Sequence, residues 1–358
     1  STDELIDMAK DINPTPSKRE MDMLMTTGEQ VSVSLMAMAM GSLGVPAISL
    51  NAFQVAMHTT HRYGNAQLKR IDTDRIRNEL EQRKIVIVTG FQGVDQFDNY
   101  TTLGRGGSDT TAVALAAALH ADACEIYTDV DGVYTADPRK VPNAKKLDEI
   151  TYDEMLEMAT LGAGVLHNRS VELAKKYNVK LEVLSSFTGH PGTKVKGVAK
   201  RMEKTAVSSV AKDKDIARIA LVGVPNEVGT SFKVFSLLAQ NHINVDIILQ
   251  GIGHEEGKDI CFTVAEGDLK KAAELLESHK AELRFARLET NADIAKVSVV
   301  GSGMINNPGV AAKLFEALYD AHININMIST SEIKISVLVD KKDADRAVQA
   351  VHDKFFAF

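Results

Sequence analysis

The sequence contains no tryptophan, only eight prolines and only two cysteines among its 358 residues. Hydrophobic residues make up 44% and charged residues 25%, a composition that excludes a disordered or fibrous chain. The length exceeds that of one ordinary domain, so we expect two or three domains. Positive charge is also in deficit, with a net charge of −7. This argues against nucleic acid as a partner, because such binding depends on an excess of lysine and arginine.

Long hydrophobic runs are missing as well. The longest, residues 31–43, is interrupted by serines and a glycine and is shorter than the ~20 residues that span a bilayer, so we expect no membrane partner. Cys124 and Cys261 lie in separate apolar runs, which predicts buried thiols in a reducing cytoplasm. His58 and His61 lack a nearby third ligand, so we expect no metal site. The chain begins without methionine or a signal-like segment, as if inside a domain.

Short apolar runs alternate with amphipathic segments between residues 45 and 184. This pattern predicts an α/β domain with a central, mostly parallel sheet flanked by helices. We expect strands at Ala47–Leu50, Ile85–Thr89, Glu125–Thr128 and Leu181–Leu184. We expect helices at Arg75–Gln82, Thr110–His120, Tyr152–Thr160 and Asn168–Tyr177.

The remainder of the chain repeats itself, because Ile216–Ile248 aligns with Ile294–Ile328. Such a repeat indicates two copies of one supersecondary unit. The first copy predicts a βαββαβ unit, with elements at Arg218–Val224, Gly229–Asn241, Val245–Leu249, Asp259–Val264, Leu269–His279 and Glu282–Arg287. The second copy ends after the helix Ala344–Phe355, one strand short. We expect Ala206–Ala211 to supply that strand and interleave the modules, since an open sheet edge is usually avoided.

The segment Thr102–Thr110 places Gly104, Gly106 and Gly107 before an alanine-rich helix, with Ser108 or Asp109 expected as its N-cap. A helix start lined by glycines can bind an anion through backbone N–H groups. Arg105, between the glycines, can hold a carboxylate or phosphate through two parallel hydrogen bonds. A tight turn with a capped helix remains the structural alternative.

Three segments together resemble aspartate kinases: GFQGV at Gly90–Val94, TTLGRGGSDTTA at Thr101–Ala112 and TDVDGVYTADPR at Thr128–Arg139. Their order and spacing are more specific than any one alone, and the resemblance extends over both repeats. It implies an amino-acid kinase domain at 1–188 without its N-terminal phosphate-loop segment, a linker at 189–205 and a regulatory region at 206–358. That region would hold two ferredoxin-like ACT modules, at about 214–290 and 291–358.

The resemblance implies ATP-dependent phosphorylation of the β-carboxylate of L-aspartate, the first step of lysine, threonine and methionine biosynthesis. Arg105 would bind the α-carboxylate, with Ser108 and Asp109 as further catalytic residues. Glu29 would accept the ammonium group, although alone it could be a solvated carboxylate near a helix start. The implied substrate-binding residues are Thr27, Glu29, Arg105, Gly106, Gly107 and Ser108.

The same resemblance implies a site for ATP and Mg²⁺. Thr128 and Asp129 would lie near the ribose and base, Tyr134 against the adenine, and Asp137 and Arg139 near the phosphates. A turn-rich loop capped by its aspartates is the alternative that the residues alone leave open. The implied nucleotide-binding residues are Thr128, Asp129, Tyr134, Thr135, Asp137, Pro138, Arg139 and Gly164.

Two features depart from the family pattern. The lysine- and glycine-rich phosphate loop of the KFGG type is absent from the sequence, and Gly164 stands where the family usually has a lysine. Loss of such a cationic group can cost several kcal/mol of transition-state stabilisation. The expectation is therefore an N-terminally truncated chain whose activity in this form is open.

The tandem ACT modules imply allosteric feedback inhibition by lysine and/or threonine in an oligomer that is at least a homodimer. The implied effector residues are Asn226, Ser231, Gln250, Asn324 and Ile325. Two alternatives stay open: another amino-acid kinase, acting on glutamate or acetylglutamate, and a non-catalytic amino-acid sensor.

Overall fold

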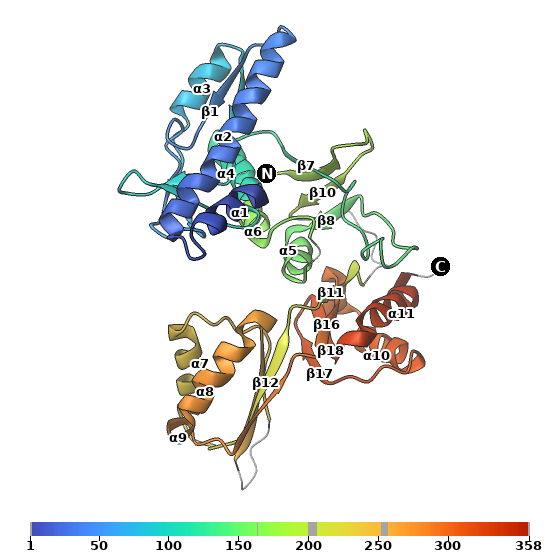
Figure 1. Ribbon diagram of the computed structural model, residues 1–358. Coiled ribbons are helices and arrows are strands. Elements are labelled where there is room, and N and C mark those ends of the chain that lie inside the picture. The colour runs from blue at the N-terminus through green and yellow to red at the C-terminus, as the bar shows by residue number, and fades with distance from the viewer. Residues whose placement is uncertain (1, 163, 200–205, 252–256, 357–358) are drawn as a thin grey trace. The chain divides into compact units, whose positions relative to one another are not determined.

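The computed structural model describes residues 2–162, 164–199, 206–251 and 257–356 (Figure 1). The chain divides into two compact units. Unit 1 comprises Ser1–Val133, Leu147–Thr160 and Gly164–Lys200, and unit 2 comprises Tyr134–Lys146, Leu161–Ala163 and Arg201–Phe358. Residues 200–205 of the expected linker lie outside the described residues.

Unit 1 has the predicted α/β character. Its helices are α1 (Thr2–Ile12), α2 (Lys18–Ser42), α3 (Asp74–Glu81), α4 (Gly107–Leu119), α5 (Tyr152–Thr160) and α6 (Asn168–Tyr177). Its strands are β1 (Ala47–Leu50), β2 (His58–Thr59), β3 (Leu68–Arg70), β4 (Ile85–Val88), β5 (Gln92–Val94), β6 (Tyr100–Thr102), β7 (Cys124–Thr128), β8 (Glu149–Thr151), β9 (Leu181–Ser185) and β10 (Thr193–Lys196). β1 pairs with β4 and β7 with β9 in parallel. The sheets β3-β2-β5-β6 and β7-β9-β10-β8 also contain antiparallel pairs.

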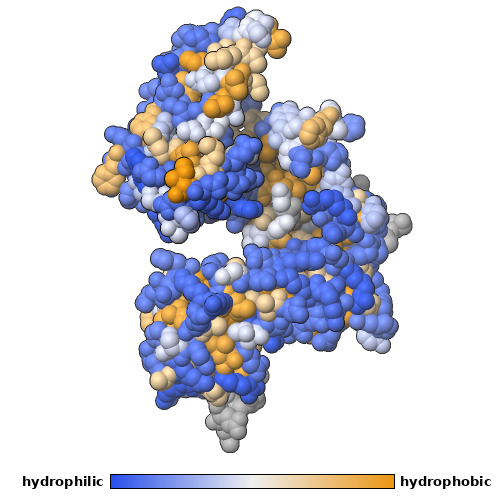
Figure 2. All heavy atoms as spheres, viewed as in Figure 1, coloured by the Kyte–Doolittle hydropathy of each residue, from blue (hydrophilic) through white to orange (hydrophobic). Residues whose placement is uncertain are grey.

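Helix α2 is fixed to unit 1 through a buried carboxylate. Asp22, with 2% of its surface exposed, accepts hydrogen bonds from the backbone N–H groups of Gly64 and Thr102 and from the Thr102 hydroxyl, at 2.8–3.0 Å. Burial raises the pKa of Asp22, while these hydrogen bonds act in the opposite direction. The C-terminal half of α2 instead exposes apolar side chains, visible as the hydrophobic colours along that helix in Figure 2. Among the described residues, no helix is both long and apolar enough to cross a membrane.

Unit 2 contains two modules of similar topology. The first module is the sheet β13-β14-β12-β15 with α7, α8 and α9, and the second is the sheet β11-β16-β18-β17 with α10 and α11. The strands are β11 (Ser209–Asp213), β12 (Ala217–Val224), β13 (Ile248–Gln250), β14 (Lys258–Val264), β15 (Arg287–Asn291), β16 (Ile294–Val300), β17 (Met327–Thr330) and β18 (Lys334–Asp340). The helices are α7 (Thr230–Gln240), α8 (Leu269–Ser278), α9 (Lys280–Leu283), α10 (Val310–Asp320) and α11 (Ala344–Phe356).

The strand expected at Ala206–Ala211 is observed slightly later, as β11. It pairs antiparallel with β16, from Ser209 opposite Val300 to Asp213 opposite Lys296. β11 therefore occupies beside β16 the position that β15 occupies beside β12. The segment preceding the first module in sequence thus completes the sheet of the second.

The strand expected at Glu282–Arg287 is wrong. Leu283 and Phe285 are both buried in the core of the first module, and this alternate spacing is typical of a strand. Here, however, Leu283 ends the short helix α9, and the chain turns at Arg284, which has a positive φ of 56°. Both side chains reach the core from this turn. β15 begins only at Arg287.

Candidate functional site

Both predicted substrate motifs are attached to the turn at Gly90–Gln92. The side chain of Gln92 is fully buried and donates a 2.6 Å hydrogen bond to the carbonyl of Thr26 in α2, while accepting one from Thr89 Oγ1 at 2.9 Å. On the other side, the backbone N–H of Phe91 donates to Thr111 Oγ1 in α4 at 3.1 Å. The turn therefore holds α2 near Thr27 and α4 near its first turn.

Close backbone packing explains the glycines around this turn. A β-carbon on Gly90 would lie only 3.0 Å from Ser108 Oγ, and one on Gly107 only 2.8 Å from the Phe91 ring. The expected N-cap was wrong, because α4 begins at Gly107 and its N-cap is Gly106, with φ of 65°. Glycine adopts this conformation readily. Ser108 is exposed within the first helical turn, and Arg105 is exposed just before it.

Helix α2 brings Glu29 to this region. Glu29 follows Thr26 by three residues, so both lie on similar faces of the helix. Glu29 is half-buried, and burial raises the pKa of its carboxyl. A desolvated carboxylate gains more from a cationic partner than a solvated one does. Thr27 is exposed, and its hydroxyl donates to the carbonyl of Leu24 at 2.7 Å, so its side chain is engaged within the helix.

The first turn of α4 also faces the start of α6, which sequence reasoning missed. Burial raises the pKa of Asp109, while a backbone hydrogen bond with His167 lowers it. His167 is the N-cap of α6. A β-carbon on Gly106 would lie 2.1 Å from the β-carbon of His167. Arg169 then donates to the carbonyls of Leu103 and Ala66, at 2.5 and 2.9 Å. The sequence pointed to this contact between α4 and α6 only through the position of His167 at the end of the run LGAGVLH.

The predicted nucleotide residues fall in both units. Thr128 ends β7 in unit 1 and Asp129 follows it, and Thr128 Oγ1 donates to Asp129 Oδ1 at 3.1 Å. Residues 134–139 belong to unit 2. There the Asp137 carboxylate accepts the backbone N–H and two guanidinium N–H groups of Arg139, at 3.0–3.1 Å. Arg139 holds the pKa of Asp137 below its usual value.

The four other predicted nucleotide residues differ in exposure. Tyr134 is half-buried and Pro138 is exposed, whereas Thr135 is buried. Gly164, in unit 1, is exposed with φ of 68°. A lysine at this position would adopt a conformation that costs residues other than glycine about 1 kcal/mol or more. The local backbone at Gly164 therefore favours glycine over lysine.

Thr135 contacts the last helix of the chain. Its Oγ1 lies 2.8 Å from Nε2 of His352 in α11 and accepts the backbone N–H of Lys145 at 2.9 Å. The His352 ring is fully buried and stacks on Phe356, with ring centroids 4.7 Å apart. Burial lowers the pKa of His352; the negative charge of Asp353 raises it and the positive charge of Lys145 lowers it.

This lowered pKa predicts acid-sensitive stability of unit 2. Because the folded state holds His352 neutral, the unfolded chain binds the proton first, and stability should be lost as pH falls below about 6.5. The loss should reach at most ~1.4 kcal/mol per pH unit until the folded group also titrates. Urea unfolding at pH 7.5, 6.5 and 5.5 tests this. His352→Gln should flatten the dependence, whereas the exposed His322→Asn should leave it intact; equal slopes in both variants would contradict the assignment.

The predicted effector residues lie in both modules of unit 2. Ser231 Oγ donates to Gln250 Oε1 at 2.9 Å, joining α7 to β13, and Asn226 is exposed in the loop before α7. Asn324 is exposed before β17, and Ile325 packs against the core of the second module.

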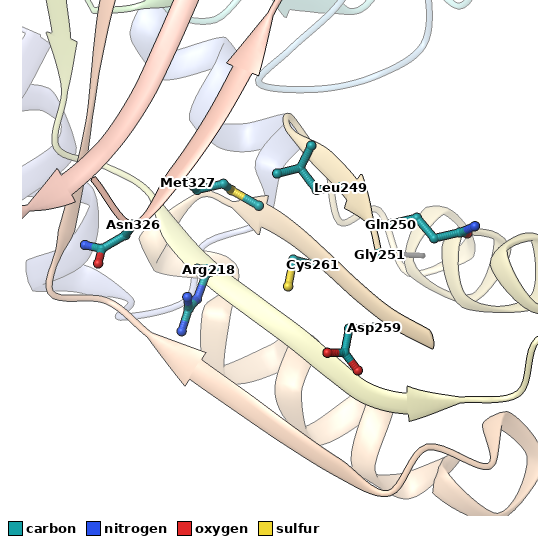
Figure 3. A pocket seen from close by; sticks show the side chains of 8 residues that line it. All are labelled: Arg218, Leu249, Gln250, Gly251, Asp259, Cys261, Asn326 and Met327. Atoms are coloured by element: carbon teal, nitrogen blue, oxygen red, sulfur yellow. The ribbon is translucent and has the colours of Figure 1, made fainter. Parts of the chain in front are cut away.

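Of these predicted residues, Gln250 lines a cavity of about 390 Å³ (Figure 3). Arg218, Asp259 and Cys261 from β12 and β14 also line it, so the cavity carries side chains of both charges. The full set of lining residues is Arg218, Leu249, Gln250, Gly251, Asp259, Cys261, Asn326 and Met327. Both cysteines of the chain are free thiols; Cys124 is buried, but Cys261 is only half-buried beside this cavity.

Family models match along most of the chain: the amino acid kinase family at residues 1–185 and ACT domains at 218–284 and 297–355. An aspartokinase of a Bacillus species is 50% identical over 355 residues, covering 99% of this chain and 86% of its own length. Escherichia coli aspartokinase III with aspartate and ADP (R-state) superposes with a TM-score of 0.84 at 30% identity, covering 99% of this chain and 80% of that one. The same enzyme with lysine and aspartate (T-state) gives 0.74 at 30% identity, covering 99% and 79%.

Proposed function

Since the chain belongs to the aspartokinase family, we propose that it transfers the γ-phosphoryl group of ATP to the β-carboxylate of L-aspartate. A carboxylate oxygen forms the new bond to the γ-phosphorus as the bond to the β,γ-bridging oxygen breaks, giving 4-phospho-L-aspartate and ADP. Such a reaction requires positioning and charge stabilisation rather than a covalent protein intermediate. The supporting observation is that two helices are hydrogen-bonded to the Gly90–Gln92 turn: α4, which follows the glycine loop with Arg105, and α2, which carries Glu29.

Aspartate would be held through its two charged α-groups. We assign its α-carboxylate to Arg105 and its ammonium group to Glu29, since a site with one cationic and one anionic partner recognises an amino acid well. Ser108 is exposed in the first turn of α4, where it would donate to the β-carboxylate. Asp109, in the same helical turn, is assigned as a further catalytic residue, and burial raises the pKa of its carboxyl.

The nucleotide would use Thr128, Asp129 and residues 134–139. Arg139 is exposed and its guanidinium is positioned by Asp137, so we assign its positive charge to the phosphates. Among the described residues, no cluster of three or more His, Cys, Asp or Glu side chains could hold a metal. Mg²⁺ is often bound by one or two carboxylates together with substrate phosphates, so Asp137 fits a Mg²⁺ ion that arrives with ATP. When bound, Mg²⁺ would neutralise charge on the β- and γ-phosphates.

The experiment that tests this function measures ADP release by the full-length protein with Mg-ATP and aspartate, glutamate or N-acetylglutamate. Turnover only with aspartate is expected, and turnover only with another acceptor would reject the assignment. Thermal shifts with each ligand separate the sensor alternative, because a ligand that binds the native state raises its stability. Shifts with lysine or threonine and none with Mg-ATP would favour a non-catalytic sensor.

We also propose feedback inhibition by lysine and/or threonine through the ACT modules, in a cytoplasmic homo-oligomer of at least two chains. The regulatory region would comprise about residues 206–358, after a linker at 189–205 and a kinase domain at 1–188. Arg218 and Asp259 give the cavity beside Gln250 one cationic and one anionic side chain, as an amino-acid effector requires. Asn226, Ser231, Asn324 and Ile325 remain the other proposed effector residues.

Gln250→Ala and Asn324→Ala should each relieve this inhibition with aspartate turnover nearly unchanged. Allosteric coupling energies of about 1–3 kcal/mol correspond to roughly 5- to 150-fold changes in affinity, so the effector concentration for half-inhibition should rise at least tenfold. Inhibition curves at fixed substrate provide the measurement, and the exposed Gln240→Ala serves as the control. A parallel fall in uninhibited turnover would argue that these residues support the fold rather than the effector.

A further inference from the structure

We propose that His352, in the last helix of the regulatory region, positions the nucleotide loop through its contact with Thr135. The proposal rests on the assignment of Tyr134–Arg139 to ATP under the proposed function. It gives Thr135 a new role, because this residue would support the loop rather than touch the nucleotide. His352 would be a positioning residue of the kinase reaction.

The loop Tyr134–Lys146 is closed at its base by Thr135. The backbone N–H of Thr135 donates to the carbonyl of Lys145, and the N–H of Lys145 donates back to Thr135 Oγ1, both at 2.9 Å. Tyr134 and Lys146 form the next bridge outward. The carbonyl of Thr135 accepts the N–H of Val210 in β11 at 2.7 Å. Thr135 is therefore bonded through its backbone and its side chain, with 3% of its surface exposed.

Helix α11 contacts the loop at further points. Asn143 Nδ2 donates to Asp353 Oδ1 at 2.8 Å, and Gln349 Nε2 donates to Asn143 Oδ1 at 3.3 Å. Ala136 and Val141 are buried in the apolar core of the second module, together with Val348 and Val351 of α11. The loop is thus packed and hydrogen-bonded as part of the second module, although it lies within the residues that match the amino acid kinase family.

The residues assigned to the phosphates extend from this fixed base. Asp137 and Arg139 follow Thr135 by two and four residues, and the carbonyl of Asp137 accepts the N–H groups of Lys140 and Val141 at 2.9 Å. A tilt of the base would displace the Asp137–Arg139 ion pair. Displacement of a positioned group by about 1 Å can cost a hundredfold in rate, so loss of the His352 contact should weaken the use of ATP.

His352 provides a specific contact at this base. Its Nδ1 is buried without a hydrogen-bond partner among the described residues. Its Nε2 is the ring nitrogen that lies within hydrogen-bond distance of the loop. Phenylalanine would retain the ring and its stacking on Phe356 while removing this bond. Glutamine would place an amide nitrogen near the position of Nε2 and could restore it.

The test compares wild type, His352→Phe, His352→Gln and Thr135→Val in the full-length protein, without effector. His352→Phe and Thr135→Val should raise KM for Mg-ATP about tenfold, with KM for aspartate within about twofold of wild type and no additional loss in the double variant. In His352→Gln, KM for Mg-ATP should return most of the way to the wild-type value. Arg346→Ala, on the exposed side of α11, is the control and should match wild type.

The outcomes separate this proposal from the proposed function. If wild type phosphorylates aspartate and His352→Phe keeps its KM for Mg-ATP, the positioning role is rejected alone. If KM rises equally for both substrates, or His352→Gln restores nothing, the residue has only a structural role and the proposal again fails. If wild type shows neither turnover nor a thermal shift with Mg-ATP, the proposed function fails first.

Discussion

Replacing Arg105 with alanine should lower kcat/KM for aspartate about a hundred- to a thousandfold, equivalent to ~3–4 kcal/mol of transition-state stabilisation. The reason is that its guanidinium is the group assigned to the α-carboxylate, and a two-point charged hydrogen bond is stronger than a neutral one. Most of the effect should be in KM for aspartate, with KM for Mg-ATP little changed. Steady-state kinetics with each substrate varied in turn provide the measurement.

Arg105→Lys and Arg70→Ala are the comparison variants. Lysine keeps the charge but lacks the planar pair of donors, so Arg105→Lys should lie between wild type and Arg105→Ala. Arg70 is an exposed arginine of unit 1 that forms an ion pair with Asp72 at 3.7 Å, and its removal should change neither constant. Wild-type kinetics in Arg105→Ala would refute the assignment of the substrate carboxylate.

Gly106→Ala should lower the unfolding free energy of unit 1 by about 2–5 kcal/mol and abolish aspartate turnover. A left-handed alanine costs ~1–2 kcal/mol, and the new β-carbon would lie 2.1 Å from the β-carbon of His167, which requires overpacking worth a further ~1–3 kcal/mol. Denaturant unfolding monitored by circular dichroism measures the change. The first turn of α4 must move away from α6 to relieve the overlap.

Gly44 provides a matched control for this variant. Its φ of 74° resembles the 65° of Gly106, but a β-carbon there would meet no atom within 4 Å. Gly44→Ala should therefore cost only the conformational part, ~1–2 kcal/mol, and leave turnover intact. Equal losses in the two variants would show that crowding against His167 is not what requires glycine at Gly106.

Regular elements could be predicted where local periodicity and tertiary packing agree. The predicted helices Tyr152–Thr160 and Asn168–Tyr177 have the same bounds as the observed α5 and α6, because the buried residues of both recur at helical spacing. The turn through Arg284 could not be predicted, since Leu283 and Phe285 alternate as in a strand. The cap of α4 was missed for a similar reason: Ser108 has a good capping side chain, but crowding by His167 selects Gly106.

The motifs identified the family and most candidate residues, whereas the contacts that position those residues join distant parts of the chain. Gln92 bonds to Thr26, and Thr135 contacts His352, 217 positions away. No local pattern predicts such pairs, because each partner alone is an ordinary polar residue. The family resemblance therefore implied a nucleotide contact for Thr135, whereas its burial favours a supporting role.

The pairing of β11 with β16 has a consequence for folding during synthesis. The whole first module is translated between these two strands, so β11 emerges from the ribosome well before its partner. The first module can fold while the N–H and C=O groups of β11 are still unpaired. A strand in this state is prone to pair with the wrong partner. Once folded, that module brings its two ends close together and shortens the effective loop that must close. The inserted module would then act as an internal template for assembling the other.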